Sequence, residues 1–107
     1  MKNKVILITG ANKGIGETLS LEFSKIGANV VLLGRNEESL DSVYDEIIAT
    51  TSAKPLIIKC DLGNIDANGG KQINDEIMRA YGRLDGVIFN AAKLGKMSTT
   101  VSYTHLR

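Results

Sequence analysis

A short apolar run followed by closely spaced glycines most strongly constrains how this chain can fold. Residues 5–8 are Val-Ile-Leu-Ile, a branched apolar run that predicts a buried strand. Gly10, Gly14 and Gly16 follow, and a helical pattern begins among them. Glycines let the backbone turn sharply and let a phosphate approach where a Cβ would block it. The first N–H groups of a helix have no partner within it and favour a bound anion. This unit therefore predicts a pyrophosphate site, with three ordinary turn glycines as the alternative.

Strand-like and helix-like segments alternate through the rest of the chain. Apolar runs at 29–33, 56–60 and 84–89 predict strands, and periodic segments at 14–27, 36–50 and 71–81 predict helices. This alternation indicates an α/β fold of the Rossmann type, a doubly wound parallel sheet with right-handed crossovers. The predicted strand order is 3-2-1-4, with the sheet ending after the fourth strand and a nucleotide at the switch between strands one and four.

The two faces of the sheet are expected to be covered unequally by the helices. The first helix should present an apolar stripe of Ile15, Leu19, Phe23 and Ile26, and the segment 64–70 is expected to be a loop. The first two helices cover one face and the third covers the other. The strand at 84–89 is then an open edge, and apolar side chains are expected to be uncovered around Ile6, Ile8, Val87 and Phe89.

Composition excludes several classes of function. The 107 residues carry a net charge of +1, which gives no reason to expect nucleic acid or a membrane as partner. A single cysteine, Cys60, excludes an internal disulfide and favours a reducing compartment. No apolar run approaches the roughly 20 residues of a membrane span, and we expect no signal peptide before the first strand. We therefore expect a cytoplasmic protein, without a metal site because only one histidine and one cysteine are present.

Four stretches together resemble one known family. They are residues 9–16 (Thr-Gly-Ala-Asn-Lys-Gly-Ile-Gly), 34–36 (Gly-Arg-Asn), 60–62 (Cys-Asp-Leu) and 84–92 (Leu-Asp-Gly-Val-Ile-Phe-Asn-Ala-Ala). Each falls at the carboxyl end of a predicted strand, where open α/β sheets bind ligands. In this respect the chain resembles the short-chain dehydrogenase/reductase family from its first strand to about residue 97. The resemblance implies an oxidoreductase that transfers a hydride between a nicotinamide cofactor and a small carbonyl or alcohol substrate, acting as a homo-oligomer.

The resemblance also implies which residues touch the cofactor. Gly14, Ile15 and Gly16 would lie against the pyrophosphate, and Ala92 stands where the family usually has glycine. Asp61 would accept a hydrogen bond from the adenine amino group, although the residue alone could equally cap a turn. Asn90 would brace the sheet. The full set of implied cofactor-binding residues is Gly10, Asn12, Lys13, Gly14, Ile15, Gly16, Arg35, Asn36, Asp61, Leu62, Asn90, Ala91 and Ala92.

The end of the second predicted strand bears on the choice of cofactor. Folds that bind NAD usually place an acid about 20 residues after the glycines, where it holds the ribose 2′-hydroxyl. Here that position is Gly34, followed by Arg35, so no carboxylate repels a 2′-phosphate. Arg35 can hold the phosphate with two hydrogen bonds, and Lys13 adds a second positive charge. We predict NADP rather than NAD; two solvated surface cations are the alternative.

The family's catalytic pattern is absent from these residues. The resemblance calls for a serine followed by Tyr-x-x-x-Lys, but Tyr44, Tyr81 and Tyr103 are followed four residues later by Ile48, Asp85 and Arg107. We therefore assign no catalytic residue and expect an amino-terminal part of a longer enzyme that is inactive alone. The alternative is a non-catalytic module that binds or senses a dinucleotide. A binder of adenosyl-methionine would require an acid where Gly34 and Arg35 stand.

The last residues differ from the rest of the chain. Residues 1–97 are predicted to form the nucleotide-binding domain, and residues 98–107 an irregular tail. Residues 101–107, Val-Ser-Tyr-Thr-His-Leu-Arg, have no apolar period and no counterpart in the family. They resemble the translation of a sequencing adaptor, so we hypothesise that they are not native. His105 is accordingly not expected to act as a base or a metal ligand.

Overall fold

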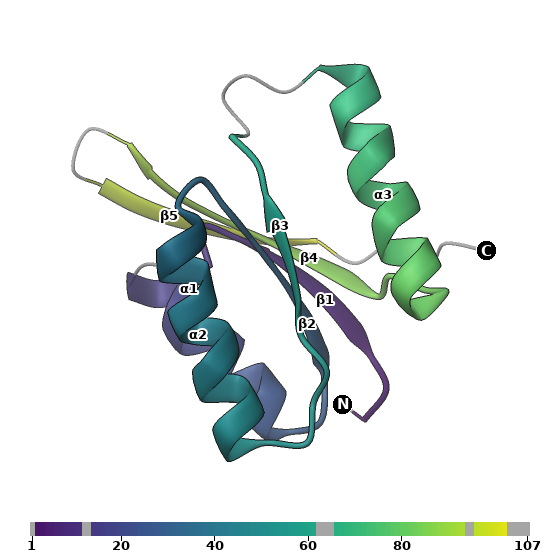
Figure 1. Ribbon diagram of the computed structural model, residues 1–107. Helices are drawn as coiled ribbons and strands as arrows, with labels where there is room; N and C mark the ends of the chain where they lie inside the picture. The colour runs from purple at the N-terminus through teal and green to yellow at the C-terminus, as the bar shows by residue number, and fades with distance from the viewer. Residues whose placement is uncertain (1, 12–13, 62–65, 94–95, 103–107) are drawn as a thin grey trace.

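The computed structural model describes residues 2–11, 14–61, 66–93 and 96–102. Its sheet has four parallel strands, which are β1 (Val5–Thr9), β2 (Asn29–Gly34), β3 (Leu56–Lys59) and β4 (Gly86–Lys93) (Figure 1). They lie in the order β3-β2-β1-β4, which confirms the predicted Rossmann-like arrangement. All five residues of β1 are buried, as expected for a central strand covered on both faces.

Three helices cover the sheet. They are α1 (Gly14–Lys25), α2 (Glu37–Thr50) and α3 (Ala67–Tyr81), and α1 and α2 lie on the face opposite α3 (Figure 1). The strands alternate between two cores. Towards α1 and α2 they bury Ile6, Ile8, Val30, Leu32 and Ile88, and towards α3 they bury Val5, Leu7, Val31, Leu33 and Ile58. The layering of the helices agrees with the sequence prediction.

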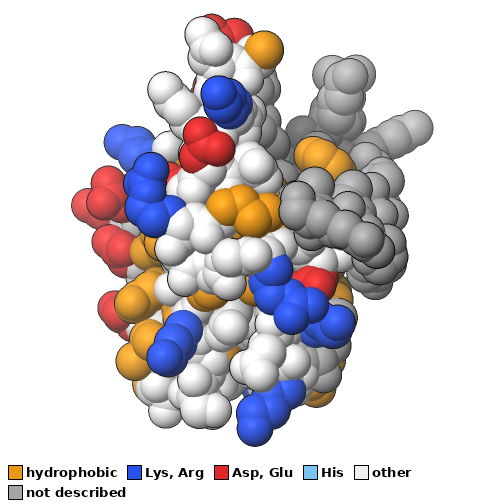
Figure 2. Space-filling model, turned by 90° about the vertical axis from the view of Figure 1, so that its right-hand side faces the viewer, with side chains coloured by type: hydrophobic (Ala, Val, Ile, Leu, Met, Phe, Trp, Pro, Cys, Tyr) orange, Lys and Arg blue, Asp and Glu red, His pale blue; other side chains and the backbone are white. Residues whose placement is uncertain are grey.

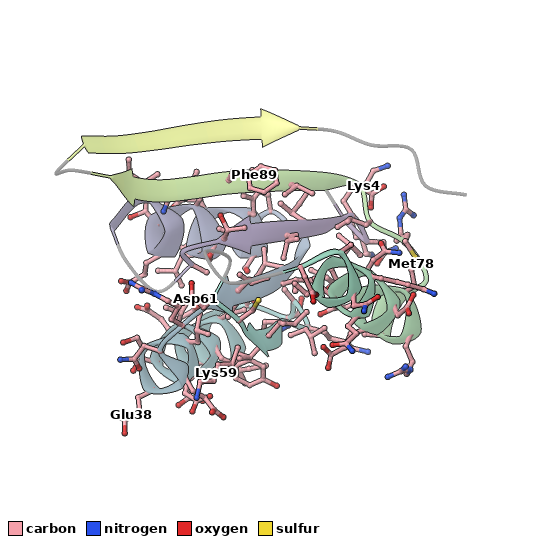
Figure 3. The ribbon with its side chains drawn as sticks, turned by 90° about the horizontal axis from the view of Figure 1, so that it is seen from above. Lys4, Glu38, Lys59, Asp61, Met78 and Phe89 are labelled. Atoms are coloured by element: carbon pink, nitrogen blue, oxygen red, sulfur yellow. The ribbon has the colours of Figure 1, made fainter. Side chains whose placement is uncertain are left out.

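The prediction of uncovered strand residues was partly wrong. Ile6 and Ile8 are buried, because they face α1 and α2 rather than the sparsely covered side. Phe89 is 47 % exposed, as expected. Figure 3 shows why: Phe89 lies on β4, whereas α3 lies over the half of the sheet formed by β2 and β3. On the face that Figure 2 shows, the hydrophobic side chains of the described residues are scattered among polar and charged ones.

The buried side of α1 also differs from the prediction. Of the expected stripe, Leu19 and Phe23 pack against the core, but Ile15 and Ile26 are 44 % and 55 % exposed. The residues that α1 buries are Gly16, Ser20 and Ser24, which lie on one helical face. The serine hydroxyls donate to the carbonyls of Gly16 and Ser20, so their burial leaves no polar atom unsatisfied. A face of small residues lets α1 approach the sheet more closely than an isoleucine stripe would allow.

The bounds of α2 and α3 are set by caps. The side chain of Asn36 accepts a hydrogen bond from the Ser39 N–H at 3.1 Å, which confirms its predicted role as the cap of α2. Helix α3 begins four residues earlier than the predicted 71, so the expectation of a loop over 64–70 was wrong from residue 67 onwards. Asp66 accepts from the Gly69 N–H at 2.8 Å and thereby supports a helical turn whose glycines resemble a loop.

A fifth strand replaces part of the predicted irregular tail. Residues 96–102 form β5 (Lys96–Ser102), which pairs antiparallel with β4, so the expectation of an irregular segment was wrong for residues 98–102. Thr99, Thr100 and Val101 are β-branched and favour strands, and β4 offers an edge on which they can pair. Pairing extends β4 to Lys93, so Asn90, Ala91 and Ala92 lie within the strand rather than after it. Residues 103–107 lie outside the described residues.

Candidate functional site

The candidate site lies at the carboxyl edge of the parallel sheet. There β1 ends beside the turn that leads into α1, and β4 runs past it on the side opposite β2. Connections leave β1 towards the face covered by α1 and α2, and the strand order reverses between β1 and β4. Open α/β sheets bind their ligands at such switch points. Figure 3 shows this edge from above, with Asp61 at it and Lys4 at the opposite end of the sheet.

The turn after β1 requires glycine at two positions. Gly10 has φ +62° and Gly14 has φ +46°, a left-handed region that other residues enter only with strain. Asn12 and Lys13, which are predicted to lie near the adenosine ribose, are outside the described residues. Helix α1 begins at Gly14. The N–H groups of Gly14, Ile15 and Gly16 therefore lie in its first turn, where N–H groups have no acceptor within the helix.

Position 16 has room only for glycine, because neighbouring atoms lie where a Cβ would be. A Cβ at Gly16 would lie 2.1 Å from the carbonyl oxygen of Gly10 and 2.7 Å from Nδ2 of Asn90. A Cβ at Gly10 would lie 2.7 Å from the carbonyl oxygen of Asn90. The turn, the head of α1 and β4 are therefore packed together at van der Waals distance. This packing fixes the head of α1, with the first N–H groups of the helix, at the edge of the sheet.

Asn90 braces the turn from β4. Its Nδ2 donates a hydrogen bond to the carbonyl of Gly10 at 3.4 Å, and its backbone N–H donates to the Thr9 hydroxyl at 2.9 Å. Both Thr9 and Asn90 are buried. The expectation that Asn90 holds neighbouring backbone is thus met by its hydrogen bonds. Thr9 belongs to the glycine motif, but its bridging role cannot be predicted from the motif because the contact spans 81 residues.

Arg35 and Asn36 lie where β2 meets α2. Both are exposed, and they follow Gly34, the last residue of β2. Among the residues that the structure describes, none forms an ion pair with the Arg35 guanidinium. The side-chain oxygen of Asn36 is engaged by the α2 cap, and its amide nitrogen is a hydrogen-bond donor. The end of β2 thus presents a cation and an amide donor, with no carboxylate at residues 34–36.

Asp61 follows β3 by two residues and is half-buried. Cys60 before it donates its N–H to the carbonyl of Gly34, which ties the ends of β2 and β3 together at 2.8 Å. Asp61 therefore lies beside the segment that carries Arg35. Leu62, predicted to lie next to an adenine ring, is outside the described residues. Only the backbone positions of Ala91 and Ala92, within β4, are described.

The groups with clearly shifted pKa values lie away from this edge. A hydrogen bond from Arg83 lowers the pKa of the Asp85 carboxyl, with help from the Val5 N–H and against its partial burial. Asp85 precedes β4, at the opposite end of the sheet. Burial, together with nearby Tyr44, raises the pKa of Tyr81 to about 12, and its hydroxyl donates to the Lys54 carbonyl. These groups hold strands and helices together and offer no acid or base to the candidate site.

The described residues at this edge exclude two other kinds of site. In the described parts of the chain, no three His, Cys, Asp or Glu side chains are grouped so that they could hold a metal ion. Within those same parts, every helix is too short or too polar to span a bilayer. What remains is a glycine turn with helix amides, an arginine one strand away and a half-buried carboxylate beyond it.

Comparison with known proteins agrees with this geometry. The family of short chain dehydrogenases matches residues 4–105. YciK, an uncharacterised oxidoreductase of Escherichia coli K12, is 39 % identical over 95 residues, which are 89 % of this chain and 38 % of that protein. A 3beta-hydroxysteroid dehydrogenase of Mediterraneibacter gnavus is 38 % identical over 90 % of this chain and 34 % of its own length. The chain thus spans little more than a third of the length of these relatives.

A solved structure supports the same assignment. A short chain dehydrogenase from Shigella flexneri, crystallised with NADP, matches 88 % of this chain and 39 % of its own with a TM-score of 0.82 and 38 % identity. Since the family match covers nearly all of the chain and the fold agrees closely, the protein belongs to the short-chain dehydrogenase/reductase family.

Proposed function

We propose that this chain forms the part of an NADP site that holds the pyrophosphate and the adenosine 2′-phosphate. The observation that carries the proposal is the packing of Gly16 against Gly10 and Asn90, which leaves no room for a Cβ. A turn by itself would not require such close packing. The packing would hold the amides at the head of α1 at the edge of the sheet. Those amides and the helix dipole favour a phosphate.

The 2′-phosphate is the basis for preferring NADP over NAD. Arg35 is exposed at the end of β2, and no acid stands at residues 34–36. A guanidinium can donate two parallel hydrogen bonds to a phosphate, whereas a carboxylate there would select the 2′-hydroxyl. Lys13 adds a second cation in this proposal. The NADP-bound relative from Shigella flexneri supports the same preference.

The adenine is proposed to lie beyond β3. Asp61 is half-buried at that end of the sheet and would accept a hydrogen bond from the adenine amino group, with the Leu62 backbone beside the ring. Ala91 and Ala92 of β4 would face the adenosine half of the cofactor. Together with the glycine turn, these positions would surround the adenosine and pyrophosphate from three strands.

The reaction itself is proposed for a longer protein of which this chain is the nucleotide-binding part. Such an enzyme would move a hydride between the nicotinamide of NADP and a small carbonyl or alcohol, as the family membership suggests. This chain spans about a third of its relatives, and its tyrosines are not followed by the Tyr-x-x-x-Lys pattern. The 107 residues would therefore bind the cofactor without catalysing the reaction.

A second candidate is a dinucleotide-binding or sensing module without catalysis. The specific observation in its favour is that Tyr44 and Tyr81 are followed by Ile48 and Asp85 instead of lysine. The discriminating observation is the genomic sequence that follows this chain. A serine with Tyr-x-x-x-Lys about a dozen residues later indicates the enzyme, and an open frame lacking both indicates the module.

Calorimetric titration of the chain with NADP and with NAD tests the proposal. We expect NADP to bind more tightly, and Arg35→Ala to weaken NADP binding by about ten- to a hundredfold while changing NAD binding little, because only NADP carries the phosphate. Arg79→Ala is the matched control, since Arg79 is an exposed arginine in the last turn of α3, next to Met78 at the other end of the sheet (Figure 3). Equal losses for both dinucleotides would refute the role of Arg35, and no binding of either would refute the proposed function.

A further inference from the structure

The start of α3 carries a dipeptide that is chemically reactive by itself. Among the asparagines of the sequence, only Asn68 is followed by a glycine. In such a pair the glycine nitrogen can attack the side-chain amide carbon of the asparagine, because no Cβ on the glycine hinders the approach. Both residues lie in the first turn of α3, where the Asn68 side chain is exposed. Among the described residues, none forms a hydrogen bond with that side chain.

The reaction of this pair is a deamidation that consumes only water. The Gly69 nitrogen gives its proton to solvent and forms a bond to Cγ of Asn68, while the bond from Cγ to Nδ2 breaks and ammonia leaves. The product is a cyclic succinimide. Water then opens the ring. Cleavage between the Gly69 nitrogen and Cγ gives aspartate, whereas cleavage between that nitrogen and the backbone carbonyl carbon gives isoaspartate.

The closed helical turn restrains this reaction. The Gly69 N–H donates to Oδ1 of Asp66, the N-cap of α3, at 2.8 Å. A carboxylate that accepts this hydrogen bond opposes the loss of the proton from the nitrogen. Ring closure also requires Cβ of Asn68 and the Gly69 nitrogen to lie in one plane about the Cα–C bond, which a helical ψ of about −42° does not allow. The turn must therefore open before the ring can form.

The first turn of α3 is weakly held. It contains Gly69 and Gly70, and glycine lowers the stability of a helix relative to alanine. A Cβ added at Gly70 would meet nothing within 4 Å, so no other element packs against the turn there. The residue that α3 buries is Ile77, about two turns further along the helix. Closure of the turn therefore depends on Asp66, whose backbone carbonyl also accepts from the Gly70 N–H at 3.1 Å.

We propose that Asn68 is a site of spontaneous deamidation and that the Asp66 cap controls its rate. Opening of the turn releases the Gly69 N–H from the carboxylate and frees the backbone of Asn68 to close the ring. An aspartate product keeps the turn, since a negative charge is favourable at the start of a helix. An isoaspartate product adds a methylene to the backbone and prevents the turn from closing again. The modification needs no ligand and does not depend on the proposed cofactor site.

Peptide mapping by mass spectrometry tests the proposal after the folded chain has been incubated at mildly alkaline pH. The tryptic peptide 60–71 carries Asn68, and fragment ions assign the modified residue within it. The peptide 72–79 carries Asn74, an asparagine within α3 that is followed by Asp75 and serves as the internal control. We expect conversion of the amide to the acid at Asn68, with isoaspartate as the larger product, and an intact Asn74. Equal conversion of both asparagines would refute a specific site.

Two variants shift the closure of the turn in opposite directions. Asp66→Ala removes the cap and should speed deamidation of Asn68 about fivefold. Gly70→Ala strengthens the same turn without altering the reacting pair and should slow the reaction about threefold. Asp75→Ala removes another exposed acid of α3 and should leave the rate unchanged. Circular dichroism checks that each variant is folded, and Gly70→Ala decides the question if Asp66→Ala is not. Equal rates in Gly70→Ala and the unaltered chain, or an unmodified Asn68 in every variant, would overturn the proposal.

Discussion

The hydroxyl of Thr9 accepts a hydrogen bond from the backbone N–H of Asn90 at 2.9 Å, across two strands that are 81 residues apart in sequence. The Thr9 hydroxyl oxygen also lies 3.5 Å from the carbonyl oxygens of Ile88 and Asn90, to either of which it can donate. Thr9 is the last residue of β1, so this contact is made immediately before the chain turns at Gly10. It therefore links the end of the central strand to the residue that braces the glycine turn.

Replacing Thr9 tests this link directly. Thr9→Val keeps the shape of the side chain but removes the acceptor of the Asn90 N–H in a buried place, so we expect the free energy of unfolding to fall by about 1–3 kcal/mol. Thr9→Ser retains the hydroxyl and is the matched control. Denaturant unfolding followed by circular dichroism measures both. If Thr9→Val were as stable as Thr9→Ser, the hydrogen bond would not support the fold.

Gly16 and Gly70 offer a paired test of close packing. We expect Gly16→Ala to abolish detectable NADP binding and to lower the melting temperature, because its Cβ would lie 2.1 Å from the Gly10 carbonyl oxygen. Gly70 lies in α3 with no atom within 4 Å of an added Cβ. Gly70→Ala should therefore stabilise the protein by about 0.5–1 kcal/mol and leave binding unchanged. Calorimetric titration and thermal unfolding measure both variants, and normal NADP binding by Gly16→Ala would contradict the site geometry.

Gly34 tests the choice between the two dinucleotides. It ends β2, and it is not among the described glycines with positive φ, so an L-residue can adopt its backbone conformation. We expect Gly34→Asp to weaken NADP binding by about tenfold or more and to strengthen NAD binding, because a carboxylate repels the 2′-phosphate and accepts from the 2′-hydroxyl. Gly34→Asn has the same size without the charge and is the control. Calorimetric titration with NADP and with NAD measures the affinities of both variants. Equal affinities in Gly34→Asp and Gly34→Asn would contradict this prediction.

Tyr81 makes stability depend on alkaline pH. Burial raises its pKa from 10.0 to about 12, so its stabilising contribution is complete below pH 10 and is lost as the pH rises from 10 towards 12. The hydroxyl also donates to the Lys54 carbonyl and thereby joins α3 to the segment before β3. We expect Tyr81→Phe to lower the free energy of unfolding by about 1 kcal/mol at neutral pH and to flatten its decline above pH 10. Denaturant titrations at a series of pH values measure this, with Tyr44→Phe for comparison; an unchanged pH profile would contradict it.

Much of the fold follows from local patterns in the sequence. Apolar runs bounded by glycine and polar residues predict the four parallel strands, and their alternation with helices predicts the order 3-2-1-4. Asn36 caps α2 where its position before two glutamates indicates. These predictions succeeded because strand, helix and cap are decided within a few residues. The cofactor role of the implied residues stays a prediction.

The failures concern contacts that local patterns do not encode. Periodicity assigns Ile15 and Ile26 to the buried side of α1, yet that side is formed by Gly16 and Ser20, whose hydroxyl bonds the helix backbone. Hydrophobicity ranks isoleucine above glycine and serine, but the close approach of α1 to the turn admits only small side chains. Likewise, β5 depends on the edge that β4 provides, which the composition of residues 96–102 does not reveal.

The sequence by itself determined the family, the strand–glycine–helix unit and the presence of Gly34 followed by Arg35 where NAD-binding folds carry an acid, because each is a matter of residue type and short spacing. Only the tertiary structure decided that Thr9 and Asp85 tie β1 to β4 and that Asn90 supports the glycine turn. Those contacts join residues about 80 positions apart, and their geometry depends on strand register. Register is fixed only when the strands pair, since a shift by one residue moves every side chain to the other face of the sheet.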